Sequence, residues 1–219
     1  MPEIVEITKE THDVKSFKLK TKVDFIPGQY CLLEIPGKDE RPFTFVNIPS
    51  ENVEFTVKKM GEFTQSFHNL KVGDSIEISE PRGDSLNFDE KRNAVFISGG
   101  SGITPFIAMI RYTIAKNLGN KIILLNFNKT ESDIIYSKEL ESVPDNIMVV
   151  NILSEQDWNG EKGRISKELI EKYVPKGNFL WYACGPPGMM HATRKIIEDL
   201  GIATLDIRIE AWEMPAKGD

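Results

Sequence analysis

A glycine-rich loop at residues 99–105 (GGSGITP) has the residue types and spacing to bind a phosphate group. It follows the apolar run AVFIS and precedes a helical pattern, so its glycines and the helix amino terminus would favour a diphosphate. Pro105 stands where the usual dinucleotide fingerprint has its third glycine, a position suited to the first turn of a helix. The loop lacks the lysine of a P-loop, and Ile103 replaces the glycine that a nucleophile elbow needs. The loop predicts nucleotide binding, with a merely tight strand-to-helix turn as the alternative.

A second loop, residues 184–190 (CGPPGMM), follows the apolar run NFLWYA. Ligands of open α/β sheets bind outside the carboxyl ends of the strands, so we expect this loop and the glycine-rich loop to face one crevice. The alternative is a Gly-Pro-Pro turn that starts a helix, with Cys184 as a small buried residue.

The segment Arg41-Pro42-Phe43-Thr44 combines a cation, an aromatic ring and a hydroxyl group. These groups are suited to a phosphate, the face of a ring and a ring heteroatom, respectively. The alternative is an ordinary strand with one solvated arginine.

Near the carboxyl terminus Glu210 precedes Trp212 by two residues, which places both on one face of a strand. A terminal tryptophan of this kind is either a packing anchor or a lid over a cofactor.

The elements that must position these residues change in character near residue 90. Residues 15–79 show short alternating runs between turn formers, which predict a small antiparallel barrel or sandwich, interrupted by a short helix that Thr64 would cap and that runs to Asn69. Beyond residue 90, solid apolar strands alternate with helices expected near residues 103–117, 137–142, 166–173 and 187–200. Strands without polar alternation predict a parallel sheet that is buried on both faces.

Composition excludes several functional classes. The 219 residues carry a net charge of −6, and the longest basic cluster is Lys58-Lys59, so we expect neither a nucleic-acid binder nor an anionic-membrane binder. Two cysteines and three histidines predict no disulfide framework, iron–sulfur cluster or metal site. The amino-terminal residues have neither the basic start nor the apolar stretch of a targeting signal. No apolar run is long enough to span a membrane, so we expect a cytoplasmic protein.

Taken together, the motifs resemble the ferredoxin–NADP reductase-like family of flavoprotein reductases, from about Phe25 to Trp212. The resemblance rests on the order of the landmarks along the chain. They are FIPGQY (25–30), RPFT (41–44), GEFT (61–64), VGD (72–74), EPRG (80–83), GGSGITP (99–105), the Trp158-x-Gly160-x-x-Gly163-Arg164 pattern and CGPPGM (184–189).

The resemblance implies an FAD-binding antiparallel β-barrel domain at residues 1–91, followed by an NAD(P)-binding α/β domain at residues 92–219. It implies that Arg41 contacts the flavin phosphates, Phe43 lies against the isoalloxazine ring and Thr44 bonds the reactive flavin nitrogen. The other implied flavin contacts are Pro42, Val57, Lys58, and the main chain of Gly61, Phe63 and Thr64.

For the pyridine nucleotide, the resemblance implies binding by both loops, with Cys184 beside the nicotinamide ring. The implied contacts are Gly100, Gly102, Thr104, Pro105, Cys184, Gly185, Pro186 and Met189. Thr44, Cys184, Glu210 and Trp212 would be the catalytic set, with Glu210 and Trp212 flanking the flavin. Glu155 follows Ser154 where NADP-using relatives often carry arginine, which favours NADH, although Lys129 leaves NADPH open.

The implied activity is transfer of hydride from NAD(P)H to FAD, and of electrons from FAD to a separate acceptor. That acceptor would be a ferredoxin, a flavodoxin or an oxygenase component, because no cysteine after Cys184 is available for a fused cluster. Two alternatives remain: a flavin reductase that uses free flavin as a substrate, and an electron-transfer subunit that is active only within a complex.

Overall fold

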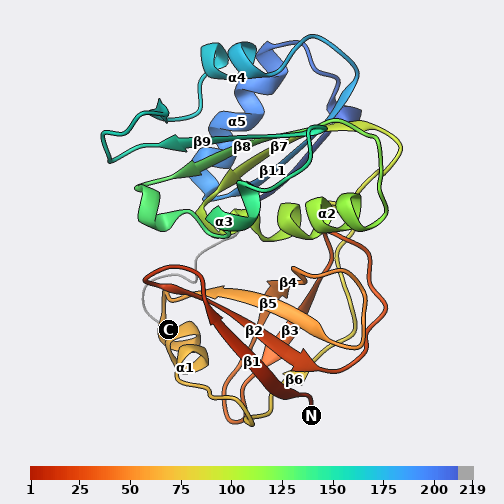
Figure 1. The fold of residues 1–219 in the computed structure, drawn as a ribbon, viewed down its shortest axis with the longest axis vertical. Helices are drawn as coiled ribbons and strands as arrows, with labels where there is room; N and C mark the ends of the chain where they lie inside the picture. Colours follow the sequence, from red (N-terminus) through yellow and green to blue (C-terminus); the bar gives the residue numbers. More distant parts are fainter. Residues whose placement is uncertain (212–219) are drawn as a thin grey trace. The chain divides into compact units, whose positions relative to one another are not determined.

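The computed structural model describes residues 1–211 and divides into two compact units (Figure 1). The first unit comprises residues 1–89 and 104–118, and the second comprises residues 90–103 and the chain from residue 119 on. No helix within residues 1–211 has the length and apolar character needed to cross a membrane. The sequence-based boundary between residues 91 and 92 stays a prediction.

The first unit is an antiparallel barrel, as predicted. One sheet has the order β1-β2-β5 and the other has the order β4-β3-β6. Isolated bridges join the sheets at both edges, between Phe45 and Phe55 and between Glu3 and Ser75, so the edge strands do not remain open. The strands are β1 (Glu3–Lys9), β2 (Val14–Lys20), β3 (Tyr30–Glu34), β4 (Glu40–Thr44), β5 (Val53–Lys58) and β6 (Glu77–Ile78).

Helix α1 (Glu62–His68) lies in the barrel unit and starts earlier than the sequence indicated. Gly61 is its N-cap, whereas Thr64 is the third residue of the helix and not the cap. The Thr64 hydroxyl accepts the N–H groups of Met60 and Gly61 at 2.8 and 3.0 Å. The side chain of Thr64, inside the helix, therefore accepts N–H groups of residues that precede the helix, as the third residue of a capping box does.

Helix α2 (Thr104–Ala115) follows the short 3-10 helix η1 (Gly100–Ile103) and belongs to the first compact unit. Arg111 donates to the carbonyl oxygen of Val46 at 2.8 Å and lies 3.6 Å from the Glu54 carboxylate. Arg111 thus ties the helix that follows the glycine-rich loop to strand β5 and to the residue after Phe45 in the barrel.

The second unit contains a six-stranded parallel sheet of order β10-β9-β8-β7-β11-β12. The chain adds strands on one side of β7 and then returns to add β11 and β12 on the other side, which makes the β7–β11 pair the topological switch point. The strands are β7 (Asn93–Gly99), β8 (Ile122–Asn128), β9 (Ile147–Leu153), β10 (Glu161–Lys162), β11 (Phe179–Gly185) and β12 (Ile207–Ala211).

Helices α4 (Lys167–Tyr173) and α5 (Pro187–Asp199) cover one face of this sheet (Figure 1). Leu169 and Ile170 of α4 and Ile197 of α5 pack on alternate residues of the central strands, such as Val95 and Ile97. The remaining elements are short: η2 (Glu131–Asp133), α3 (Ser137–Leu140) and η3 (Thr204–Asp206). The predicted helices are all present, within a few residues of their expected bounds.

His68 provides a test of the barrel's packing. Its Nε2 lies 2.8 Å from the Val57 carbonyl oxygen, and burial lowers the pKa of the ring below its ordinary value despite that bond. Because the unfolded chain then binds the proton more tightly than the folded chain, stability is lost as the pH falls through about 6.5. We expect His68→Gln to reduce the loss of thermal stability between about pH 7.5 and 5.5. His12→Gln, at an exposed ring, is the control, and an unchanged slope in His68→Gln would contradict this account.

Candidate functional site

Two loops lie against each other at the switch point of the parallel sheet. A Cβ atom on Gly102 would lie 2.1 Å from the main-chain oxygen of Cys184, and one on Gly99 would lie 2.8 Å from Cδ of Pro186 and 2.7 Å from Sδ of Met189. Any side chain at Gly102 would therefore collide with main-chain atoms. The predicted convergence of the two loops is confirmed, and Gly102 is required for the packing between them.

Gly100 has a different role from Gly102. Its φ is +53°, in the left-handed region, and no atom lies within 4 Å of a Cβ placed there. The main chain at Gly100 therefore borders open space, whereas Gly102 is enclosed. Gly100 is the position of this loop that leaves room for a ligand, and Thr104 and Pro105 begin the helix that follows.

A row of polar side chains crosses five strands near the carboxyl edge of the sheet. The strand register places Asn151, Asn126, Ser98, Cys184 and Glu210 side by side. Ser98 donates to Asn126 Oδ1 at 2.8 Å, and Asn126 Nδ2 donates to Asn151 Oδ1 at 2.8 Å. Ser98 and Asn126 are buried, so these bonds fix the strands at a place where an unpaired polar group would be costly.

Cys184 and Glu210 form the other end of this row. Cys184 is fully buried and Glu210 is half-buried on the adjacent strand. The predicted catalytic residues Cys184 and Glu210 are therefore neighbours, and Trp212 lies outside the described residues.

The polar members on β7, β8 and β9 were not predicted. Their only sequence signal is the presence of polar residues within otherwise apolar strands: Ser98, Asn126 and Asn151.

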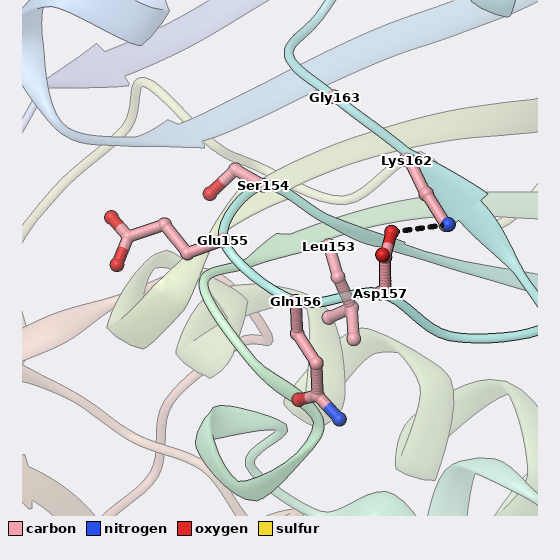
Figure 2. Close-up of a pocket in the computed structure, with 7 residues that line it drawn as sticks. All are labelled: Leu153, Ser154, Glu155, Gln156, Asp157, Lys162 and Gly163. Atoms are coloured by element: carbon pink, nitrogen blue, oxygen red, sulfur yellow. Dashed lines mark hydrogen bonds and ion pairs between the residues drawn. The ribbon is translucent and has the colours of Figure 1, made fainter.

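An open pocket of about 480 Å³ lies beyond the ends of β9 and β10 (Figure 2). It is lined by Leu153, Ser154, Glu155, Gln156, Asp157, Lys162 and Gly163. Glu155 forms an ion pair with Lys129 at 3.1 Å, and Lys162 donates to Asp157 at 2.6 Å, which lowers the pKa of the Asp157 carboxyl group. Each of these two lysines therefore already faces a carboxylate.

In the barrel unit, Arg41 and Phe43 share one face of β4 and both contact Phe63 of α1. The Arg41 guanidinium lies 5.9 Å from the centre of the Phe63 ring, and the Phe43 and Phe63 rings are stacked at 6.1 Å. Thr44 and Pro42 alternate onto the other face of the strand, and Thr44 is buried opposite Tyr30. A cation and an aromatic surface are thus held together beside the start of α1.

The first turn of α1 supplies main-chain donors at the same place. Gln65 makes the first bond of the helix, to the carbonyl oxygen of Gly61, so the N–H groups of Glu62, Phe63 and Thr64 have no acceptor within the helix. The Gly61 N–H is already bonded to Thr64 Oγ1. Of the predicted main-chain donors, those of Phe63 and Thr64 are therefore the better placed.

Two predicted flavin contacts have other partners in the structure. The Val57 side chain is fully buried in the barrel core, and its carbonyl oxygen is bonded to His68, while Lys58 pairs with Asp13 at 3.3 Å. The second thiol, Cys31, is also in this core, where burial raises its pKa to about 12 and keeps it protonated.

Comparison with known proteins identifies both halves of the chain, with residues 104–118 of the first unit falling in the second match. Residues 2–86 match the oxidoreductase FAD-binding domain and residues 96–195 match the oxidoreductase NAD-binding domain. A probable dihydroorotate dehydrogenase B (NAD(+)), electron transfer subunit, of Pyrococcus furiosus is 30% identical over 95% of this chain and 78% of its own length. The chain belongs to the ferredoxin–NADP reductase-like family. Another relative, the anthranilate 1,2-dioxygenase electron transfer component of Acinetobacter baylyi, is 29% identical over 95% of this chain and 65% of its own.

Solved structures of flavin- and nucleotide-binding proteins have the same fold. The ferredoxin reductase in carbazole 1,9a-dioxygenase superposes with a TM-score of 0.85 at 26% identity, over 96% of this chain and 68% of its own. The FAD/NAD-binding domain of nitric oxide dioxygenase from Vibrio cholerae gives a TM-score of 0.89 at 24% identity, over 96% and 97%. The family therefore accounts for an FAD-binding and an NAD-binding domain within one chain, and the chain is an oxidoreductase with these cofactors.

The residues present fit both cofactors. Arg41 and the donors of the first turn of α1 suit the diphosphate of FAD, because a cation and unsatisfied main-chain N–H groups both favour bound anionic oxygens. The open main chain at Gly100 suits the diphosphate of a pyridine nucleotide.

The packing of the two loops makes Gly102 the most restrictive position of the glycine-rich loop. We expect Gly102→Ala to lower the free energy of unfolding by about 1–3 kcal/mol, because the new methyl group must displace the Cys184 main chain. Gly119→Ala is the matched control, since nothing lies within 4 Å of a Cβ there, and its effect should stay within about 0.5 kcal/mol. Urea unfolding followed by circular dichroism measures both, and equal effects would show that the loop contact is not tight.

Proposed function

We propose that this protein is a flavoprotein reductase that takes hydride from NADH onto bound FAD and passes the electrons to a separate acceptor protein. The single observation that carries the proposal is the contact of the two loops at the switch point, which brings Gly100 and Cys184 to one edge of the sheet in a chain that also has an FAD-binding barrel. FAD, when bound, accepts two electrons as hydride and releases them singly. The protein's part is to bind, orient and exclude water.

The acceptor is proposed from the relatives. Several are named electron transfer components of dioxygenases or electron transfer subunits, which supports a protein acceptor such as an oxygenase component, a ferredoxin or a flavodoxin. We also propose a cytoplasmic location, in keeping with two buried cysteines that are not joined in a disulfide.

The proposal is tested by an absorption spectrum of the desalted protein, followed by anaerobic addition of NADH or NADPH. A flavin spectrum that survives desalting and is bleached by one nucleotide supports it. A colourless protein that consumes NAD(P)H only with added flavin would be a flavin reductase. A flavin-loaded protein that neither nucleotide bleaches would instead indicate a subunit that needs its complex.

Cys184 is proposed to lie beside the nicotinamide ring, because it is buried in the polar row at the switch point. We expect Cys184→Ser to slow anaerobic flavin reduction in stopped-flow measurements by about ten-fold or more, while the Kd for NADH changes little. The reason is that a small misplacement of the ring impairs transfer more than it impairs binding. Equal changes in rate and affinity, in Cys184→Ser and Cys184→Ala alike, would count against this role.

NADH is the proposed coenzyme because the pocket in Figure 2 offers carboxylates beside its lysines. A 2′-phosphate needs cationic partners, and Lys129 is paired with Glu155 while Lys162 is paired with Asp157.

Glu155→Arg should therefore raise the ratio of kcat/KM for NADPH to that for NADH by about ten-fold or more. Glu198→Arg makes the same charge change on α5, at an exposed side chain outside the lining of the pocket, and is the control. If both variants shift the ratio equally, the effect is one of net charge, and Glu155 has no specific role.

A further inference from the structure

Asn128, the last residue of β8, carries a buried amide group without a partner. The residue is only 7% exposed, and its Nδ2 has no hydrogen-bond partner. Its main-chain oxygen is occupied, because it accepts the Ser154 N–H at 3.0 Å. A buried donor without an acceptor costs free energy, and such groups in folded proteins usually have a partner. The partner of this amide is not supplied by the described part of the chain.

The strand register places Asn128 between two parts of the nucleotide site. It pairs with Leu153, which lines the pocket of Figure 2. On the other side, β7 ends at Gly99 opposite Phe127, the residue before Asn128, and Gly100 follows Gly99 as the first residue of η1. Gly100 borders open space. Asn128 therefore stands at the carboxyl edge of the sheet, at the end of the strand that lies between β7, which leads into the glycine-rich loop, and β9, which leads into the pocket.

We propose that Asn128 Nδ2 donates a hydrogen bond to an oxygen atom of the ADP half of the bound pyridine nucleotide. The inference rests on the proposed function and adds a binding residue to the same site. An amide nitrogen only donates, so its ligand must present an acceptor, and the diphosphate and the ribose of the ADP half are rich in acceptor oxygens. The nicotinamide half is assigned to Cys184, which lies on β11, beyond β7 in the strand order.

A structural role for the amide nitrogen makes the opposite prediction. If Nδ2 stabilised the fold, its replacement by a methyl group of similar size would destabilise the protein. Because Nδ2 has no partner in the ligand-free fold, we expect Asn128→Leu to keep or raise the melting temperature.

Asn120 offers a matched control at the other end of the same strand. It is also a buried asparagine with an unpartnered side-chain atom, Oδ1, but its Nδ2 donates to the Arg92 carbonyl oxygen at 3.2 Å. Asn120 precedes β8 at the amino edge of the sheet, away from the proposed nucleotide. Asn120→Leu should lower the melting temperature and leave nucleotide affinity unchanged.

The test is calorimetric titration of the FAD-loaded protein with ADP, together with thermal unfolding. We expect Asn128→Leu to weaken ADP binding by about ten-fold or more, and Asn128→Asp to weaken it further, because a carboxylate repels the diphosphate. The control Asn120→Leu should keep both the wild-type affinity for ADP and the wild-type rate of flavin reduction at saturating NADH, since Asn120 lies at the opposite edge of the sheet.

An ADP affinity of Asn128→Leu within two-fold of the wild type would overturn the proposal, whatever its melting temperature. A lower melting temperature with retained affinity would assign the side chain a structural role. Failure of the wild-type protein to bind ADP at all is a different result, because it would remove the nucleotide site and the proposed function together.

Discussion

The second unit depends on the contact between Gly102 and the main chain of Cys184. Because a Cβ at Gly102 would meet the Cys184 oxygen at 2.1 Å, the strand-to-helix turn after β7 and the turn after β11 must approach at main-chain distance. The two turns meet where the strand order reverses, which is the point at which open α/β sheets bind their ligands. The contact between the loops therefore depends on the reversal of strand order at β7 and β11, and on the absence of a side chain at Gly102.

The row of polar side chains near the carboxyl edge fixes the relative positions of the strands at this site. Ser98, Asn126 and Asn151 bond to one another within a sheet that is otherwise apolar, and Cys184 and Glu210 continue the row. A buried hydrogen-bonded chain resists rearrangement, because breaking any link leaves a buried polar group unpaired. The residues proposed for chemistry thus stand in a fixed register with residues that hold the strands.

Much of the fold could be predicted from sequence, because the hydrophobic pattern changes near residue 90 from alternation to solid apolar runs. Strand β1 was missed, since only Ile4 among its seven residues is buried and the alternation is weak. Thr64 was assigned as a helix cap, whereas it bonds backwards from the third helical position, a distinction that sequence pattern does not make.

The candidate site divides in the same way. The two loops were predicted, because glycine and proline mark turns directly in the sequence. Asn128 and the polar row were not, because an asparagine in an apolar run shows neither the register of its strand nor whether its amide has a partner. The register of the strand is seen only in the strand pairing of the structure, and the missing partner of the amide is seen only from its burial and contacts.

The most direct measurement is hydrogen–deuterium exchange of the FAD-loaded protein with and without NAD⁺, which binds without turnover. We expect exchange to slow in the two loops, residues 99–105 and 184–190, and residues 153–163 to be protected as well. Unchanged exchange in both loops at a saturating concentration of NAD⁺ would contradict the claim that their contact forms the nucleotide site.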